Sequence, residues 1–173
     1  FRFIDFANEL FNDESIKQQA VDSIIDRFRT LWNFTRQRFT SVDEKDILAQ
    51  GEFISSMLVS LYLKEQGINN RLLNSLDFMR LAPEEEPDME YIGTKLHLLL
   101  AEHKSTNVFL TQGHLCRNAY NETCYLKQGG DDVSATLIGA ALQAQEVCLW
   151  TDSKELHSCD PVSYTHLTLP TNR

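Results

Sequence analysis

The segment Val108–Asp152 decides the fold in this sequence. It opens with the apolar run Val108-Phe109-Leu110, stops at Thr111-Gln112-Gly113, and passes through a polar loop to Gln128-Gly129-Gly130-Asp131-Asp132. A small-residue helix is expected from Val133 to about Gln145, and then a strand over Val147–Trp150 that ends at Thr151-Asp152. Strand, glycine turn, helix and strand is the order of a parallel β-α-β unit, whose ligands bind beyond the carboxyl ends of the strands.

The residues before this segment predict mainly helices. Apolar residues recur at helical spacing over the first forty residues and form one stripe, Ile16, Ala20, Ile24, Phe28 and Leu31, with Val21 and Trp32 beside it. Ser41 is a candidate helix cap, with Glu44 three residues later. We expect a helix to about Gln50, an interruption at Gly51-Glu52, and a second helix over Phe53–Gln66 that ends at Gly67.

Three further segments complete the outline. Asn70–Leu76 is expected to be a short strand or a loop, and the acidic stretch Pro83–Pro87 a solvated loop. Asp88 is the expected cap of a helix from Met89 to about His103.

Glycines and carboxylates mark the candidate site, and each allows two interpretations. Gly129-Gly130 would let backbone N–H groups approach an anion at the start of a helix, although paired glycines also form simple tight turns. Asp131 and Asp132 could hold a substrate amine or a metal-bound water, or only cap the helix. Glu52 could face a site, or only be an acid favoured by the dipole at a helix start.

Composition and charge exclude several classes of protein. The chain has 173 residues and a net charge of −9, so a single domain is expected and a nucleic-acid partner is not. No apolar run approaches the roughly 18 residues of a membrane-spanning helix. The start lacks the features of a signal peptide and has no initiator Met, so we expect an internal piece of a longer protein.

The four cysteines, Cys116, Cys124, Cys148 and Cys159, have no spacing typical of a zinc site, and no metal ligand is predicted. Cys148, inside the apolar run, is expected to be a buried thiol in a reducing cytoplasm. The stretch 162–173 has no helical period and resembles foreign coding sequence, which leaves residues 1–161 as the domain.

Four motifs of the chain resemble those of the aspartokinases, in the amino acid kinase superfamily, in the same order. Gly51-Glu52-Phe53-Ile54-Ser55 is similar to Gly-Glu-x-x-Ser, and Thr111-Gln112-Gly113-His114-Leu115 to the strand end Thr-x-Gly-Phe-Ile. Gln128-Gly129-Gly130-Asp131-Asp132 is similar to Arg-Gly-Gly-Ser-Asp, and Trp150-Thr151-Asp152 followed by Asp160-Pro161 to Trp-Thr-Asp and Asp-Pro-Arg. The resemblance covers most of residues 49–161.

The resemblance implies a three-layer αβα sandwich, truncated at both ends. It implies transfer of the γ-phosphoryl group of ATP, bound with Mg²⁺, to the side-chain carboxylate of L-aspartate, the first step toward lysine, threonine and methionine. Carried over by position, the substrate would contact Glu52, Gln128, Asp131 and Asp132. The nucleotide would contact Gly113, Gly129, Gly130, Thr151, Asp152 and His157. A homo-oligomer is implied for the full-length protein, and no catalytic residue is assigned.

Several departures from the family pattern define the alternative. The opening Lys-Phe-Gly-Gly-Thr-Ser segment does not occur in the sequence, so the chain by itself is expected to be inactive. Gln128 replaces the arginine that could grip a carboxylate through two hydrogen bonds, and Asp131 replaces a serine. Either this is the central piece of an aspartate kinase, or it is a diverged nucleotide-binding or structural relative without that activity.

Overall fold

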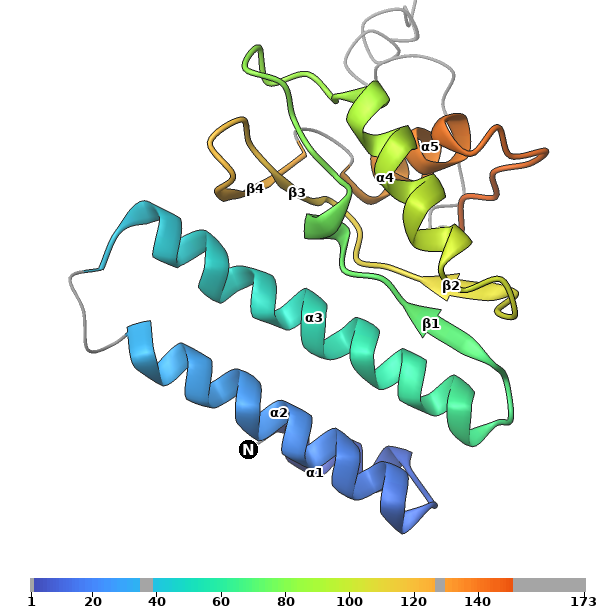
Figure 1. Cartoon of the computed structure of the whole chain (residues 1–173). Helices are drawn as coiled ribbons and strands as arrows, with labels where there is room; N and C mark the ends of the chain where they lie inside the picture. Colours follow the sequence, from blue (N-terminus) through green and yellow to red (C-terminus); the bar gives the residue numbers. More distant parts are fainter. Residues whose placement is uncertain (1, 35–38, 127–129, 151–173) are drawn as a thin grey trace, which may run out of the picture.

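The fold has three layers, with helices on both sides of a small set of strands (Figure 1). It is seen in a computed structural model, which describes residues 2–34, 39–126 and 130–150. Helices α1, α2 and α3 form one outer layer, and α4 and α5 form the other. The elements are α1 (Arg2–Leu10), α2 (Glu14–Phe34), α3 (Ser41–Glu65), β1 (Asn70–Leu72), the 3₁₀ turn η1 (Ser75–Asp77), α4 (Met89–Ala101), β2 (Val108–Leu110), β3 (Leu115–Arg117), β4 (Thr123–Tyr125) and α5 (Gly130–Ala141).

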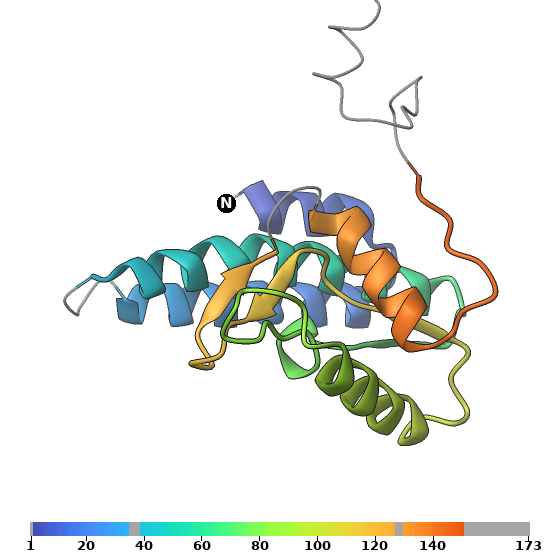
Figure 2. The same ribbon diagram turned by 90° about the horizontal axis from the view of Figure 1, so that it is seen from above.

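The first layer is built by the predicted apolar stripe. Ala20 and Ile24 are buried, Ile16, Val21 and Phe28 pack around them, and Trp32 has 63% of its surface exposed. The stripe meets one face of α3, and the view from above shows α2 and α3 running alongside each other (Figure 2). The buried residues of this core are Ala7, Phe11, Ala20, Ile24, Ile54, Leu58 and Leu61.

Helix α3 differs from the prediction because it is continuous from Ser41 to Glu65. Its cap is Thr40, not Ser41: the Thr40 hydroxyl accepts from the Asp43 N–H, and the Asp43 carboxylate accepts from the Thr40 N–H. Gly51 and Glu52 therefore lie inside the helix, and the interpretation of Glu52 as an acid at a helix start was wrong. The predicted end is confirmed, since Gly67 follows the last residues of the helix with φ +75°.

A parallel β-α-β unit is present, but it lies earlier in the chain than predicted. Strands β1 and β2 pair in parallel with Asn70 opposite Val108, and α4 connects them. The Asp88 side chain caps α4 by accepting from the Tyr91 N–H, as expected, and the acidic loop 83–87 joins η1 to that cap. The short strand or loop expected at Asn70 is thus half of the parallel pair.

The second strand of the predicted unit was wrong. Residues Val147–Trp150 form no strand, Trp150 is 94% exposed, and Cys148 is exposed rather than buried. Helix α5 ends at Ala141, and the chain then turns at Gln143, which has φ +51°. A short apolar run has no periodicity that separates a buried strand from an exposed segment, so it could not decide this point.

The expected polar loop before the glycine pair contains a β-hairpin instead. Strands β3 and β4 pair antiparallel with Cys116 opposite Cys124. In the connecting turn, the Asn118 side-chain oxygen accepts from the N–H groups of Tyr120 and Glu122. The hairpin joins the core under α4 and α5, whose buried residues are Leu73, Phe78, Met79, Leu81, Ile92, Leu96, Cys116, Cys124 and Leu126.

Within the described residues, no helix combines the length and the apolar character that crossing a membrane requires.

Candidate functional site

Two glycine segments that are far apart in the sequence meet at the start of α5. Gly113 follows β2, and Gly130 is the first residue of α5. A Cβ atom added to Gly113 would overlap the Asp131 carboxylate, and one added to Gly130 would overlap Cβ of His114. Gly113 therefore leaves room for Asp131, the residue after Gly130, and Gly130 leaves room for His114, the residue after Gly113.

The His114–Asp131 pair closes this contact. Nδ1 of His114 and Oδ1 of Asp131 are 3.1 Å apart, and the His114 side chain is 30% exposed while that of Asp131 is 78% exposed. His114 has φ +27°, and the next residue, Leu115, donates its N–H back to the Gly113 carbonyl. A residue other than glycine in this region of φ carries backbone strain, which is concentrated at functional sites in proteins.

Tyr125 links this pair to α3. Its ring centroid is 5.2 Å from that of His114, and its hydroxyl donates to the Lys45 carbonyl at 2.8 Å. Burial raises the pKa of Tyr125, and the carboxylates of Asp46, Glu52 and Glu44 raise it further. Glu52 is half-buried and close enough to act on Tyr125, so it lies on the same side of α3 as the hairpin.

A buried glutamine holds the strand end in place. Gln112 is 3% exposed, accepts from the Ser75 N–H at 2.9 Å, and donates to Oγ of Ser56 at 2.7 Å. Ser56 in turn donates to the Glu52 carbonyl at 2.7 Å. Gln112 thus ties η1, the end of β2 and the Glu52 turn of α3 into one framework.

Two buried hydroxyls beside Gln112 have no hydrogen-bond partner among the described residues. They are Oγ1 of Thr111 and Oγ of Ser75. Burying a hydroxyl without a partner costs free energy, which a ligand oxygen or a water molecule can offset.

The structure brings together part of the predicted site. Glu52, Gly113, Gly130 and Asp131 belong to one region, and Asp132 is exposed in the first turn of α5. The other predicted residues, Gln128, Gly129, Thr151, Asp152 and His157, lie outside the described residues.

Sequence reasoning missed His114, Tyr125 and Gln112 as parts of the region. Gln112 and His114 lie inside the Thr111–Leu115 motif on either side of Gly113, so their place in the motif was an available signal. Tyr125 had no such signal, because the hairpin that delivers it was not predicted.

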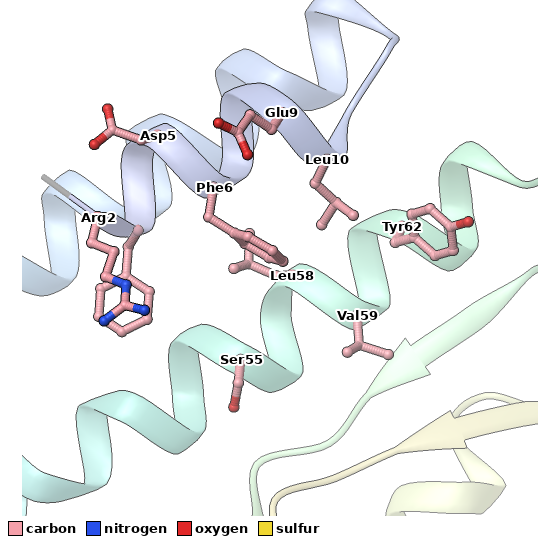
Figure 3. Close-up of a pocket in the computed structure, with 10 residues that line it drawn as sticks. Arg2, Asp5, Phe6, Glu9, Leu10, Ser55, Leu58, Val59 and Tyr62 are labelled. Atoms are coloured by element: carbon pink, nitrogen blue, oxygen red, sulfur yellow. The ribbon is translucent and has the colours of Figure 1, made fainter.

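A cavity of about 800 Å³ lies elsewhere, between α1 and α3, and is mostly apolar (Figure 3). Phe6, Leu10 and Leu58 point into it, with Arg2 and Glu9 at its rim. None of its lining residues belongs to the candidate site. In the described part of the chain, no group of three His, Cys, Asp or Glu side chains could hold a metal ion.

Comparisons of the sequence with known proteins point to one family. The sequence model of the amino acid kinase family matches residues 6–169, which extends into the stretch expected to be foreign. Bifunctional aspartokinase/homoserine dehydrogenase 2 of Escherichia coli (strain K12) is 31% identical over 118 residues, 67% of this chain and 14% of that protein. The aspartokinase of Chlamydia muridarum (strain MoPn / Nigg) is 32% identical over 126 residues, 69% of this chain and 28% of that protein.

Solved structures show the same fold. E. coli aspartokinase III in complex with aspartate and ADP (R-state) superposes with a TM-score of 0.68 at 23% identity, over 83% of this chain and 33% of that one. Its complex with lysine and aspartate (T-state) gives 0.66 at 23% identity, over 80% and 32%. This likeness establishes the three-layer αβα architecture, as expected, for a chain that spans about a third or less of these relatives. The chain belongs to the amino acid kinase family.

Proposed function

We propose that this chain is part of an aspartokinase catalytic domain, residues 1–161, which transfers the γ-phosphoryl group of ATP to the side-chain carboxylate of L-aspartate. The observation that carries the proposal is the meeting of the Gly113–His114 turn with the start of α5 at Gly130, in a chain whose relatives are aspartokinases. The product would be 4-phospho-L-aspartate, at the start of the route to lysine, threonine and methionine.

The described carboxylates suit the amino group of the substrate. Glu52 is half-buried beside Tyr125, and Asp131 and Asp132 lie in the first turn of α5. An ammonium group placed among carboxylates gains charge-assisted hydrogen bonds, which are about twice as strong as neutral ones. Gln128 would then hydrogen-bond the substrate, although without the fork of an arginine.

The same charges bear on the nucleotide. A helix start carries the equivalent of roughly half a positive charge, which Asp131 and Asp132 outweigh. Phosphates would therefore approach α5 as a Mg²⁺ complex, along Gly113, Gly129 and Gly130. Bound Mg²⁺ supplies neutralisation of charge on the transferred group, and the protein supplies positioning. Thr151, Asp152 and His157 are the proposed nucleotide contacts beyond the described residues.

One observation favours the alternative of a diverged relative without aspartate kinase activity. The Asp131 carboxylate already lies over Gly113 and faces His114, at a position where aspartokinases have a serine. An anionic substrate would have to displace or tolerate this charge.

Binding and turnover test the proposal separately. Titration calorimetry of the chain with L-aspartate, in the presence of Mg²⁺ and ADP, should show binding that Glu52→Gln weakens by about tenfold, the loss of one charge-assisted hydrogen bond. Glu9→Gln, at an exposed acid of α1 outside the candidate site, is the matched control and should leave the affinity unchanged. Equal changes in L-aspartate affinity for the two variants would show that Glu52 does not bind the substrate.

Turnover is measured on the complete gene product with ATP, Mg²⁺ and L-aspartate, with hydroxylamine trapping the acyl phosphate. We expect none from this chain alone, because the Lys-Phe-Gly-Gly-Thr-Ser segment is missing. Activity of the complete protein supports the kinase. Activity only in a Gln128→Arg, Asp131→Ser double variant supports the diverged relative, and inactivity of both proteins together with a lack of aspartate binding would refute the proposal.

A further inference from the structure

A pair of free thiols faces each other across the β3–β4 hairpin. Cys116 and Cys124 are direct register partners, and their Sγ atoms are 3.2 Å apart. The pair lies in the core beneath α4, where Cys116 is fully buried and Cys124 is 8% exposed. Neither thiol has a part in the function proposed above.

The backbone of the hairpin suits a bond between these two sulfurs. Hydrogen bonds join Leu126 N–H to the His114 carbonyl and Asn118 N–H to the Glu122 carbonyl, two residues to either side of the pair. By the alternation of an antiparallel ladder, Cys116 and Cys124 form a hydrogen-bonded pair, with a Cα separation of about 5.5 Å. Disulfides span Cα separations of roughly 4.4–6.8 Å, so the separation expected for this pair lies within that range.

The two thiols are not equivalent, because only Cys124 reaches a cavity. This cavity has a volume of about 270 Å³ and is also lined by Lys45, Tyr120 and Tyr125. The hydrogen bond between the two sulfurs lowers the pKa of Cys124, and the charge of Lys45 acts in the same direction, against burial and the carboxylates of Glu85 and Glu122. The same hydrogen bond raises the pKa of Cys116. The thiolate is the nucleophilic form of cysteine, so Cys124 is the thiol equipped to react.

We propose that Cys116 and Cys124 form an oxidative modification site, at which hydrogen peroxide oxidises Cys124 and Cys116 then closes a cross-strand disulfide. The Cys124 thiolate attacks one peroxide oxygen, the O–O bond breaks, and Cys124 becomes a sulfenic acid while hydroxide leaves and is protonated to water. Sγ of Cys116 then attacks Sγ of Cys124 and expels the sulfenic oxygen as a second water, which takes up the Cys116 proton. The two thiols lose two protons and two electrons, and hydrogen peroxide is reduced to two waters.

The bond would act on the candidate site through the hairpin that carries it. His114 directly precedes β3, and Tyr125 is the last residue of β4. A disulfide between the two strands would fix the spacing of the segments that bring these rings together.

Intact-mass analysis after hydrogen peroxide treatment tests the proposal in a Cys148→Ser, Cys159→Ser background, where the pair provides the remaining thiols. We expect a loss of two hydrogen atoms per chain, reversed by a dithiol reductant. Trypsin cleaves after Lys104, Arg117 and Lys127, so the bond should join peptide 105–117 to peptide 118–127. A chain unfolded in urea should form this bond more slowly, because the pairing comes from the hairpin.

Single variants in the same background assign the order of reaction. Cys116→Ser should stop at a sulfenic acid on Cys124 that dimedone traps, and Cys124→Ser should stay unmodified. An exposed-thiol reference, the chain with Cys148 as its one cysteine, should react with peroxide without losing two hydrogens. The proposal is overturned if the pair stays reduced while Cys148 in that reference is oxidised, if dimedone labels Cys116 in Cys124→Ser, or if folded and unfolded chains form the bond equally fast. None of these readouts depends on aspartate or nucleotide binding.

Discussion

The His114 imidazole and the Asp131 carboxylate lie 3.1 Å apart, and each is adjacent in sequence to a glycine that makes room for the other. The turn between β2 and β3 and the start of α5 are thereby held together. Four predictions follow from the packing and charge of this region.

Alanine substitutions at three glycines should change the free energy of unfolding by different amounts, because the space around each glycine differs. Gly130→Ala should destabilise the fold by about 1–3 kcal/mol, because the new methyl group meets Cβ of His114, which cannot move without its backbone. Gly113→Ala should cost less, since the Asp131 carboxylate that it meets is exposed and free to swing aside. Urea unfolding measures both free energies.

Gly51→Ala is the matched control for these variants. Gly51 lies inside α3 with nothing within 4 Å of an added Cβ, so alanine should stabilise the fold by about 0.5–1 kcal/mol. An equal loss of stability at all three positions would contradict the packing in which Gly113 faces Asp131 and Gly130 faces His114.

Gln112→Ala should destabilise the fold by about 2–3 kcal/mol. The substitution leaves the buried Ser75 N–H without its acceptor and removes the donor to Ser56. Gln19→Ala, on the exposed side of α2, should change the free energy of unfolding by less than about 0.5 kcal/mol. Thermal unfolding of the two variants beside the parent chain gives the comparison, and equal melting temperatures would show that Gln112 is not a framework residue.

Stability should fall in alkaline solution as Tyr125 ionises. The pKa of Tyr125 is raised in the folded chain above its ordinary value of 10.0, first by burial and then by Asp46, Glu52 and Glu44. The folded chain thus holds the phenolic proton more tightly than the unfolded chain. This contribution is fully present below the unfolded pKa and is lost as the pH rises through the folded pKa.

Urea midpoints of the parent chain and Tyr125→Phe, measured from neutral pH to about one unit above the ordinary tyrosine pKa, check this prediction. The parent should lose more stability than the variant over the alkaline part of the range. A constant difference between the two proteins at every pH would assign the role of Tyr125 to its hydrogen bond with the Lys45 carbonyl alone.

Asp131→Ser should strengthen binding of Mg²⁺ and ADP by a few fold, since it removes a negative charge at the start of α5. The gain is small because Asp131 is 78% exposed, and exposed charges contribute about 0–1 kcal/mol. Glu146→Ser, beyond the other end of the helix, is the charge-matched control. Weaker nucleotide binding by Asp131→Ser, with no change for Glu146→Ser, would mean that Asp131 assists the nucleotide.

Local signals in the sequence predicted most of the helices. The stripe through Ala20 and Ile24, the Asp88 cap and the Gly67 end are short-range patterns, and the structure contains each of them. The prediction of a helix break at Gly51 was wrong, because a glycine inside a helix costs only about 1 kcal/mol of stability. Phe53 and Ile54, which directly follow this turn of α3, are buried in two different apolar clusters, and their burial outweighs that cost.

The site was predictable only in part, because its contacts are long-range. The family motifs gave Glu52, Gly113 and Gly130 as candidates, and the structure brings these residues into one region. The pairing of His114 with Asp131 joins residues seventeen positions apart, and that of Tyr125 with the Lys45 carbonyl joins residues eighty apart. Both depend on the β3–β4 hairpin, whose strands of three residues are too short for a strong alternating pattern.

Gly113 makes room for Asp131, and Gly130 makes room for His114. The position of the Asp131 charge therefore depends on the size of the uncharged residue at position 113. A methyl group at position 113 changes no charge, yet it would turn the Asp131 carboxylate away from His114 and toward solvent. A family member with alanine at that position could therefore keep every ionisable residue and still present a different field to an incoming phosphate. Ligand specificity in this region can therefore change through a change in side-chain volume, without the gain or loss of a charged residue.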